Sequence, residues 1–340
     1  MSQTDCKYCI VGFGIAGQLL LLELLQRGVA GNQICILDEN FLGGALATHY
    51  STVLSNTPWW KTRKALAEYP QWSSDVLQQG DAKYQQNECM PVSDIAKYCI
   101  QTAEKAARAS QVCKITGRVM AVKTAENTAG KLLEHSYGTV NCKGPLFFTH
   151  GAEEKQLDVP LPAIPLWIGL NKQLLSQHVT TEDTVTVFGT AHSGTILLKH
   201  LQELGVKTYA VYNTAKPFLF ARDGEYDGIK EGSEKIADAI LAGEYSTLTL
   251  IPWTEPLQLY KALRSTTKVI HSVGFKPRQI QGLNNQYDAE SGKLIAYEGI
   301  YGFGIAFPGV TPKDGKIFTD VSVLSFQEQI RRCLPKILEQ

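Results

Sequence analysis

Short apolar runs and a leucine-rich stretch alternate along the first 40 residues of the chain. Residues 7–11 and 33–38 have the continuous apolar character of buried strands, and residues 15–28 have the periodicity of a helix. The glycine-rich segment 12–17 joins the first strand to the helix. This order predicts a βαβ unit with a tight glycine turn.

The same order recurs in the second half of the chain. Strands are expected at 184–188 and 207–212, with a helix at 193–204 between them. A second glycine-rich turn, Gly189-Thr190-Ala191-His192-Ser193-Gly194, precedes that helix. We interpret the two units as an internal duplication of one fold type and not as a tandem array.

The rest of the chain has weaker patterns. Residues 40–90 are rich in aromatic residues and glycine and are expected to be irregular. Residues 112–150 predict a small β-meander, and the prolines of 157–166 predict a linker. Helices are expected at 91–110, 230–243 and 325–338, and strands at 246–251 and 267–271.

Composition and charge narrow the class of protein. The 340 residues are enough for two domains, and 33 basic residues balance 33 acidic ones. No net field therefore favours nucleic acid or an anionic membrane. The apolar stretch 19–25 contains Glu23 and is too short to span a bilayer, and the polar N-terminus lacks the pattern of a signal peptide. We expect a soluble, cytoplasmic protein.

The eight cysteines are scattered and are expected to be reduced and buried. Cys6 and Cys9 form a C-x-x-C pair, which could be a redox dithiol. We expect both residues on one strand, where positions three apart face opposite sides, and this disfavours a dithiol. Without a second such pair or paired histidines, no metal site is expected.

The first glycine turn has the residues of a dinucleotide fingerprint. Gly12 makes the tight turn, Gly14 lets the backbone approach a pyrophosphate, and Gly17 packs the helix on the sheet. The helix N-terminus at Ile15 and Ala16 then directs free N–H groups at the phosphates. Asp38 ends the second strand and is expected to bind the ribose hydroxyls, with Glu39 as the alternative.

Further segments resemble the flavin-containing monooxygenases and the related N-hydroxylating and Baeyer–Villiger enzymes, within the flavoproteins that bind two dinucleotides. Gly43-Gly44 and the segment 50–58 resemble the region after the acidic residue in that group. Residues 147–151 and 268–275 resemble its two crossings between domains. The resemblance implies an α/β fold of two Rossmann-like three-layer domains. An FAD domain (1–160 and 272–340) would be interrupted by an inserted NAD(P)H domain (161–271).

The resemblance also implies site residues. Asn56 matches the asparagine that lies beside the flavin ring and helps to hold the oxygenated flavin, and it is the expected catalytic residue. Cofactor contacts are further expected at Gly44, Val119 and Gly151. Adjacent Trp59 and Trp60 either line a substrate cavity over the flavin or cover the edge of a core.

Several departures separate this chain from the family pattern. Ala191 replaces the usual middle glycine of the second turn, and the F-x-G-x-x-x-H signature before that turn is missing. The Gly-Asp pair that contacts the flavin in disulfide reductases is absent near 300–306. No reactive cysteine pair is expected near the flavin. The chain is therefore identified as an outlying member of the superfamily.

The second turn is expected to bind the nicotinamide cofactor through Gly189, Ala191, His192, Ser193 and Gly194. No acidic residue ends the strand that follows. Asn213, Lys216 and Arg222 come next instead, which favours NADPH over NADH because a cation suits a 2′-phosphate. His192 either contacts the cofactor or is an ordinary turn histidine.

These residues predict an FAD-dependent oxidoreductase in which NADPH reduces the flavin by hydride transfer. The leading hypothesis for the second half-reaction is monooxygenation of a small nucleophilic substrate such as an amine or sulfide. The alternatives are an NAD(P)H-flavin reductase or oxidase, and a non-catalytic, regulatory FAD-binding protein. The substrate and the oligomeric state, a homodimer included, stay open.

Overall fold

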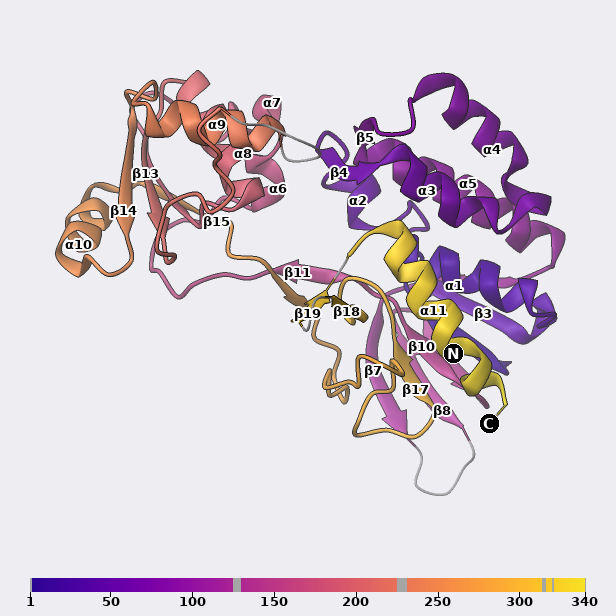
Figure 1. The fold of residues 1–340 in the computed structure, drawn as a ribbon. Coiled ribbons are helices and arrows are strands. Elements are labelled where there is room, and N and C mark those ends of the chain that lie inside the picture. The colour runs from indigo at the N-terminus through magenta and orange to yellow at the C-terminus, as the bar shows by residue number, and fades with distance from the viewer. Residues whose placement is uncertain (1, 125–129, 225–230, 314–315, 320, 340) are drawn as a thin grey trace. The chain divides into compact units, whose positions relative to one another are not determined.

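The chain forms two compact units in the computed structural model, which describes residues 2–124, 130–224, 231–313, 316–319 and 321–339 (Figure 1). The first unit contains Met1–Ala152 and Pro277–Gln340, and the second contains Glu153–Lys276. The boundaries thus fall at 152/153 and 276/277, where the sequence suggested 160/161 and 271/272. At the two crossings, β11 (Ala152–Glu154) and β16 (Phe275–Pro277) pair with each other.

A five-stranded parallel sheet of order β17-β10-β2-β3-β6 is the centre of the first unit. Both faces of this sheet are covered, so its strands are apolar throughout, and successive side chains enter different cores. Ile10 faces a core shared with helices, whereas Cys9 and Val11 face a core shared with a second sheet. The strands are β2 (Tyr8–Val11), β3 (Ile34–Asp38), β6 (Cys113–Thr116), β10 (Leu146–Phe148) and β17 (Ile300–Gly302).

Helices form the layer on one face of this sheet. The central helix α1 (Ile15–Gln26) packs against α5 (Val92–Ala109) and against α11 (Val323–Leu338), the last element of the chain (Figure 1). α1 is buried nearly all round because it lies between the sheet and these helices. The expected helices at 91–110 and 325–338 are therefore confirmed.

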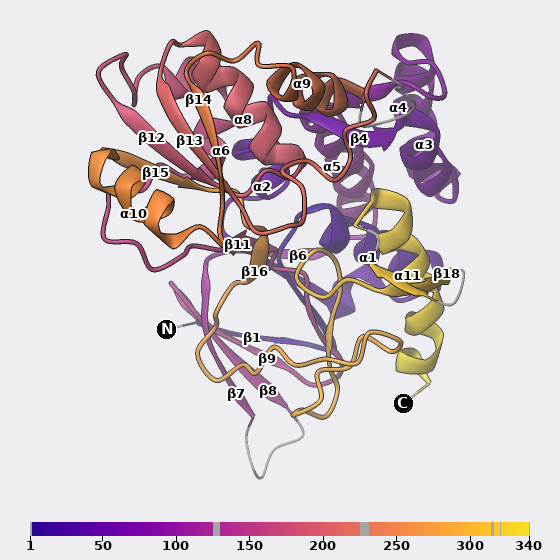
Figure 2. The same ribbon diagram turned by 60° about the vertical axis from the view of Figure 1, so that its left-hand side comes forward.

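A four-stranded sheet of order β1-β9-β8-β7 forms the third layer (Figure 2). Its strands are β1 (Ser2–Cys6), β7 (Val119–Thr124), β8 (Lys131–His135) and β9 (Gly138–Cys142). The chain bends at Lys7, so β1 belongs to this sheet and β2 to the parallel one. The prediction of a single first strand carrying both Cys6 and Cys9 is wrong. The two side chains do not diverge but enter one core.

The expectation of an irregular region at 40–90 is also wrong. Besides the one-turn helix α2 (Ala45–Thr48), this region holds an antiparallel pair of strands, β4 (Leu54–Pro58) and β5 (Cys89–Pro91). It also holds the helices α3 (Trp59–Ala67) and α4 (Pro70–Lys83). Few large apolar residues mark α4, since Trp72, Val76 and Leu77 make its apolar contact with the core and polar or small residues fill the rest of the helix. The helical period was therefore weak in the sequence.

The second unit has a four-stranded parallel sheet of order β14-β13-β12-β15. The strands are β12 (Thr184–Phe188), β13 (Lys207–Tyr212), β14 (Leu248–Pro252) and β15 (Lys268–His271). The helices are α6 (Leu166–Gly169), α7 (Lys172–Leu175), α8 (His192–Glu203), α9 (Glu231–Leu241) and α10 (Pro256–Ser265), of which α6, α7 and α10 were not expected from the sequence.

The remaining described elements are the 3₁₀ turn η1 (Gly31–Gln33) and the hairpin of β18 (Val310–Lys313) and β19 (Lys316–Thr319), both in the first unit. Within the described ranges, no helix combines the length and the apolar character that crossing a membrane would require.

A buried carboxylate links the helices of the first unit. The side chain of Glu23 on α1 is 3% exposed and accepts a hydrogen bond of 2.8 Å from the hydroxyl of Tyr69. Arg331 of α11 lies 3.3 Å from the same carboxylate, and Arg27 lies 3.5 Å from it. Burial and the Glu23 charge raise the pKa of Tyr69, so its hydroxyl stays a donor.

We predict that Tyr69→Phe destabilises the protein by about 1.5–3 kcal/mol, because a buried charged acceptor loses its hydroxyl donor. The midpoint of urea unfolding measures this change. Tyr137→Phe is the matched control, since Tyr137 is 74% exposed. Equal midpoints for the two variants would show that the Glu23 network does not stabilise the unit.

Candidate functional site

The first glycine turn has almost no space between its backbone segments. Gly12 has φ +99°, and a Cβ on it would lie 2.7 Å from the carbonyl oxygen of Thr149. A Cβ on Gly17 would lie 2.1 Å from the carbonyl oxygen of Gly12. Thr149 also donates its hydroxyl to that Gly12 oxygen at 2.7 Å. Both glycines are therefore required for α1 to start directly at the end of β2.

Gly14 has a different environment. It is the N-cap of α1 and makes no side-chain capping bond, and the nearest atoms to an added Cβ, in Gly43 and Gly44, are 4.0 Å away. The first N–H groups of α1, at Ile15, Ala16 and Gly17, have no acceptor within their own helix. The turn thus offers an open backbone surface with free donors, as a pyrophosphate requires.

Two other glycine backbones border this surface. Gly44 has φ +74°, and a Cβ on it would lie 3.1 Å from the Gly14 Cα. Gly304, which follows β17, has φ +90° and approaches the methyl group of Ala16. The turn, the loop after β3 and the segment after β17 all lie at the carboxyl end of the parallel sheet, where ligands bind in open α/β sheets.

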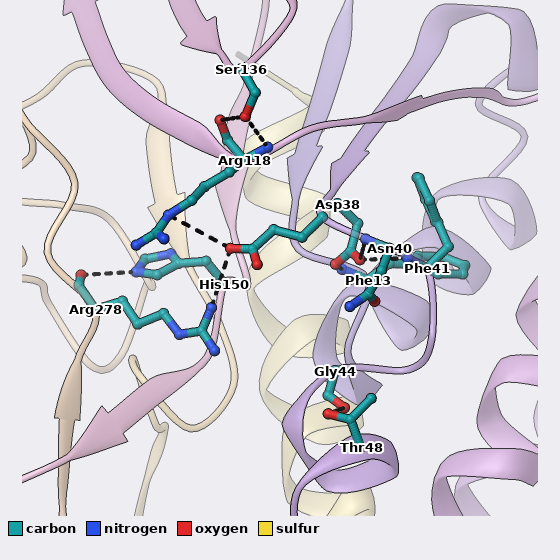
Figure 3. Close-up of polar contacts among 11 residues, drawn as sticks. Phe13, Asp38, Asn40, Phe41, Gly44, Thr48, Arg118, Ser136, His150 and Arg278 are labelled. Carbon is teal, nitrogen blue, oxygen red and sulfur yellow. Dashed lines mark hydrogen bonds and ion pairs between the residues drawn. The ribbon is translucent and has the colours of Figure 1, made fainter.

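Asp38 closes the glycine turn with its carboxylate (Figure 3). Oδ2 accepts from the backbone N–H of Phe13 at 2.6 Å, and Oδ1 accepts from Asn40 and Phe41 at 3.0 and 2.8 Å. A carboxylate has about four acceptor positions, so about one remains for a ribose hydroxyl. Asp38 is therefore where the sequence analysis expected it, but it also holds the turn together.

Glu39, the alternative ribose ligand, has two cationic neighbours, Arg118 and Arg278, which are labelled in Figure 3. Arg118 lies 3.8 Å and Arg278 lies 3.6 Å from Oε1 of its half-exposed carboxylate. No motif in the sequence indicates these two arginines, since they lie far apart in the chain. Because these two arginines engage the Glu39 carboxylate, Asp38 is the better candidate for binding the ribose.

His150 lies beside this cluster and was not expected as a site residue. Its Nε2 is 3.3 Å from the carbonyl oxygen of Arg278, while Nδ1 is buried and has no hydrogen-bond partner among the described residues. The imidazole packs edge-on against Phe148 and Phe307. Burial lowers the pKa of His150 to about 4, so the ring is neutral at pH 7. With Nε2–H donating to the carbonyl, Nδ1 is an acceptor without a donor.

The remaining expected residues of the first unit have different environments. Gly151 has φ +77° with open space around its Cα, and Val119 is buried at the start of β7. Asn56 lies in β4, and its side chain falls outside the described part of the chain. Nothing in the structure therefore tests its predicted role.

Trp59 is a core residue and not part of a cavity lining. It is 1% exposed, donates its Nε1–H to Asp81 at 2.8 Å and packs against Tyr98. Trp60 is 38% exposed and lines a surface hollow that also contacts Gln26. Gln26 is the last residue of α1, so this hollow lies at the opposite end of the helix from the glycine turn. Of the two alternatives, Trp59 therefore has the core role and not the position over a flavin, and Trp60 lies far from the turn.

The second glycine turn reproduces the geometry of the first. Gly189 has φ +97°, and a Cβ on it would lie 2.3 Å from the carbonyl oxygen of Ser272. A Cβ on Gly194 would lie 2.2 Å from the carbonyl oxygen of Gly189. Ala191, the N-cap of α8, has φ −71° and ψ −173°, and Gly14 has φ −71° and ψ −176°. The backbones match, and Ala191 adds a methyl group where Gly14 leaves space.

The polar residues around the second turn are partly occupied by contacts within the protein. His192 Nδ1 lies 2.7 Å from the hydroxyl of Ser233, and Ser193 is half-buried in the first turn of α8. Lys216 is exposed after β13, whereas Arg222 lies 3.6 Å from the buried carboxylate of Glu234. Lys216 is therefore better placed than Arg222 to meet an incoming phosphate.

Searches against protein-family models and curated proteins find no match. The fold, in contrast, has many relatives among solved structures. The bacillithiol disulfide reductase Bdr (YpdA) from Staphylococcus aureus has a TM-score of 0.61 at 13% identity over 99% of both chains. The thioredoxin reductase from T. acidophilum has a TM-score of 0.58 at 15% identity over 98% of both chains.

The HOCl-induced flavoprotein disulfide reductase RclA from Escherichia coli matches 99% of this chain and 72% of its own, with a TM-score of 0.55 at 13% identity. At such low identities these similarities establish the fold. The prediction of an α/β protein with one Rossmann-like unit inserted into another is confirmed.

We predict that Gly14→Ala weakens FAD binding about tenfold or more but changes the stability of the FAD-free protein by less than about 0.5 kcal/mol, since only a ligand would meet the new methyl group. Gly17→Ala is the contrasting variant and should destabilise the FAD-free protein by about 1–3 kcal/mol through its clash with Gly12. Fluorescence titration with FAD and urea unfolding measure the two effects. A loss of stability in Gly14→Ala would contradict an open ligand surface there.

Proposed function

We propose that this chain is an FAD-dependent oxidoreductase whose flavin is reduced by NADPH. The observation that carries the proposal is the repeated turn geometry. The turns at Gly12–Gly17 and Gly189–Gly194 have nearly the same φ angles and the same close approaches between backbones. Each precedes a helix whose N-terminus is free to receive phosphate oxygens. One chain therefore carries two dinucleotide cradles, one of them in an inserted unit.

In this proposal the first unit binds FAD. The N–H groups at Ile15 and Ala16 hold the pyrophosphate, the Gly44 backbone borders it, and the remaining acceptor position of Asp38 takes a ribose hydroxyl. FAD supplies the redox chemistry, because its ring accepts a hydride and passes electrons to an acceptor. The protein holds the ring in place and controls what reaches it.

The inserted unit binds NADPH in the proposed enzyme. The backbone between Gly189 and Gly194 holds the pyrophosphate, and the N–H groups of α8 donate to it. Lys216 meets the 2′-phosphate, since it is an exposed cation in the loop that follows β13, and no carboxylate ends that strand. The methyl group of Ala191 keeps the phosphate slightly farther away than a glycine would.

We further propose monooxygenation of a small nucleophile as the second half-reaction. The segment 50–58 with Asn56 supports this, as it resembles the matching region of the flavin-containing monooxygenases. The alternative is a reductase or oxidase, which is favoured by the names of the solved structures that share the fold. A dithiol beside the flavin would be needed for disulfide reduction of the usual kind. The thiols that contact each other here face the core between the two sheets.

Stopped-flow absorbance of the purified protein with bound FAD separates these functions. We expect NADPH to bleach the yellow absorbance rapidly and NADH to do so more slowly. On mixing with oxygen, near-ultraviolet absorbance that persists before the yellow colour returns supports a monooxygenase. Direct return of the yellow colour supports a reductase or oxidase. If NADPH does not bleach the bound FAD, the proposed enzymatic function is contradicted and a regulatory flavoprotein is favoured.

The 2′-phosphate contact has its own test. We expect Lys216→Ala to raise the Kd for NADPH about tenfold and to leave the Kd for NADH unchanged, because about 1.4 kcal/mol of charge-assisted hydrogen bonding is lost. Lys261→Ala, an exposed lysine on α10, is the control. Equal losses for both cofactors would assign Lys216 a structural role.

A further inference from the structure

Five cysteines from five strands lie together in the first unit. Cys9 of β2 is the register partner of Cys35 on β3, and Cys35 is the partner of Cys113 on β6. Cys6 of β1 is the partner of Cys142 on β9 in the facing sheet. Four of these side chains belong to the core between the two sheets, and Cys113 packs against that core. None of the five has a role in the proposed reaction.

The strand register brings neighbouring thiols within bonding reach. Adjacent strands lie about 4.8 Å apart, which falls inside the Cα–Cα range of about 4.4–6.8 Å that disulfides span. Register partners in parallel strands project from the same face of the sheet. Cys35 therefore has a thiol on each side, Cys9 inward and Cys113 at the edge strand β6.

Cys113 is the most exposed of the five thiols. Cys6, Cys9, Cys35 and Cys142 are at most 8% exposed, whereas Cys113 is only partly buried. A reagent from solvent therefore reaches Cys113 first. Hydrogen bonding from the thiols of Cys6 and Cys9 lowers the pKa of Cys35 to about 6, and burial raises that of Cys9. Cys35 therefore has more thiolate character than an ordinary thiol, and it lies directly behind the accessible Cys113.

We propose that Cys113 and Cys35 form a modification site for small hydroperoxides. The Cys113 sulfur attacks the peroxide, which breaks the O–O bond, yields a sulfenic acid at Cys113 and releases water or an alcohol. The Cys35 sulfur then attacks the Cys113 sulfur, the S–O bond breaks, and a second water leaves as the Cys35–Cys113 disulfide forms. Two thiols lose two electrons in total, and the peroxide takes them up.

A metal centre explains the cluster less well. Within the described residues, no group of three or more histidine, cysteine or acidic side chains is arranged to hold a metal ion. The linear order from edge to core suits stepwise thiol chemistry instead, because Cys9 can in turn attack a Cys35 disulfide. β3 ends at Asp38, so oxidation at Cys35 occurs three residues before the carboxylate that closes the glycine turn.

The test uses the full chain with bound FAD. Stepwise equivalents of hydrogen peroxide are added, free thiols are blocked with N-ethylmaleimide, and non-reduced tryptic peptides are analysed by mass spectrometry. Trypsin separates Cys35 (28–61) from Cys113 (109–114), so their disulfide appears as one linked pair of peptides. We expect that pair to form first. Cys89 is the control within the same molecule, since it is partly buried like Cys113 but lies outside the cluster.

Two variants sharpen the outcome. Cys113→Ser should abolish the linked pair and protect Cys35, whereas Cys333→Ser, far along the chain on α11, should leave the linkage unchanged. Oxidation of Cys89 before Cys113, or a Cys113 sulfinic acid without linkage to Cys35, would overturn the proposal. Because the wild-type peptide map already decides between these results, the test holds even if a variant folds poorly.

Discussion

The close approach of Gly17 to the carbonyl oxygen of Gly12 is the constraint on which the candidate site depends. It lets α1 begin at the end of a buried strand, so that unpaired N–H groups emerge at the edge of the sheet. An ordinary side chain at either position would push the helix away and remove that surface. Gly194 approaches the carbonyl oxygen of Gly189 in the same way, so both units join strand to helix by the same glycine turn.

The two turns differ in what closes them. In the first, Asp38 accepts from the Phe13 backbone and ties β3 to the glycine loop. In the second, Asn213 ends up exposed after β13, and the methyl group of Ala191 occupies the approach to the helix. The first cradle is therefore held by a charged side chain and is open to a ligand. In the second, the hydroxyl of Thr190 donates to the carbonyl oxygen of Pro217 in the loop after β13, and the methyl group of Ala191 leaves less room.

The local βαβ units could be predicted from the sequence, and the contacts between distant segments could not. The glycine spacings and apolar runs predicted both βαβ units, because they follow from local backbone geometry. α4 was missed because its apolar contact with the core comes mainly from Trp72, Val76 and Leu77, which mark too little of the helix to show its period. The bend at Lys7 was missed because the residues around it carry no turn signal. The prediction that Cys6 and Cys9 face opposite sides of one strand was wrong for this reason. Arg118 and Arg278 meet at Glu39 only after distant segments fold together.

The pairing of β11 with β16 has a consequence for synthesis on the ribosome. The inserted unit begins and ends at neighbouring strands, so it can fold as soon as Lys276 emerges. The first unit cannot, since its sheet still lacks β17 and its helical layer lacks α11. Residues 1–152 therefore keep an incomplete core while the inserted unit, which is synthesised after them, already folds. Nascent chains arrested before β17 would expose the apolar face of α1 and attract chaperones.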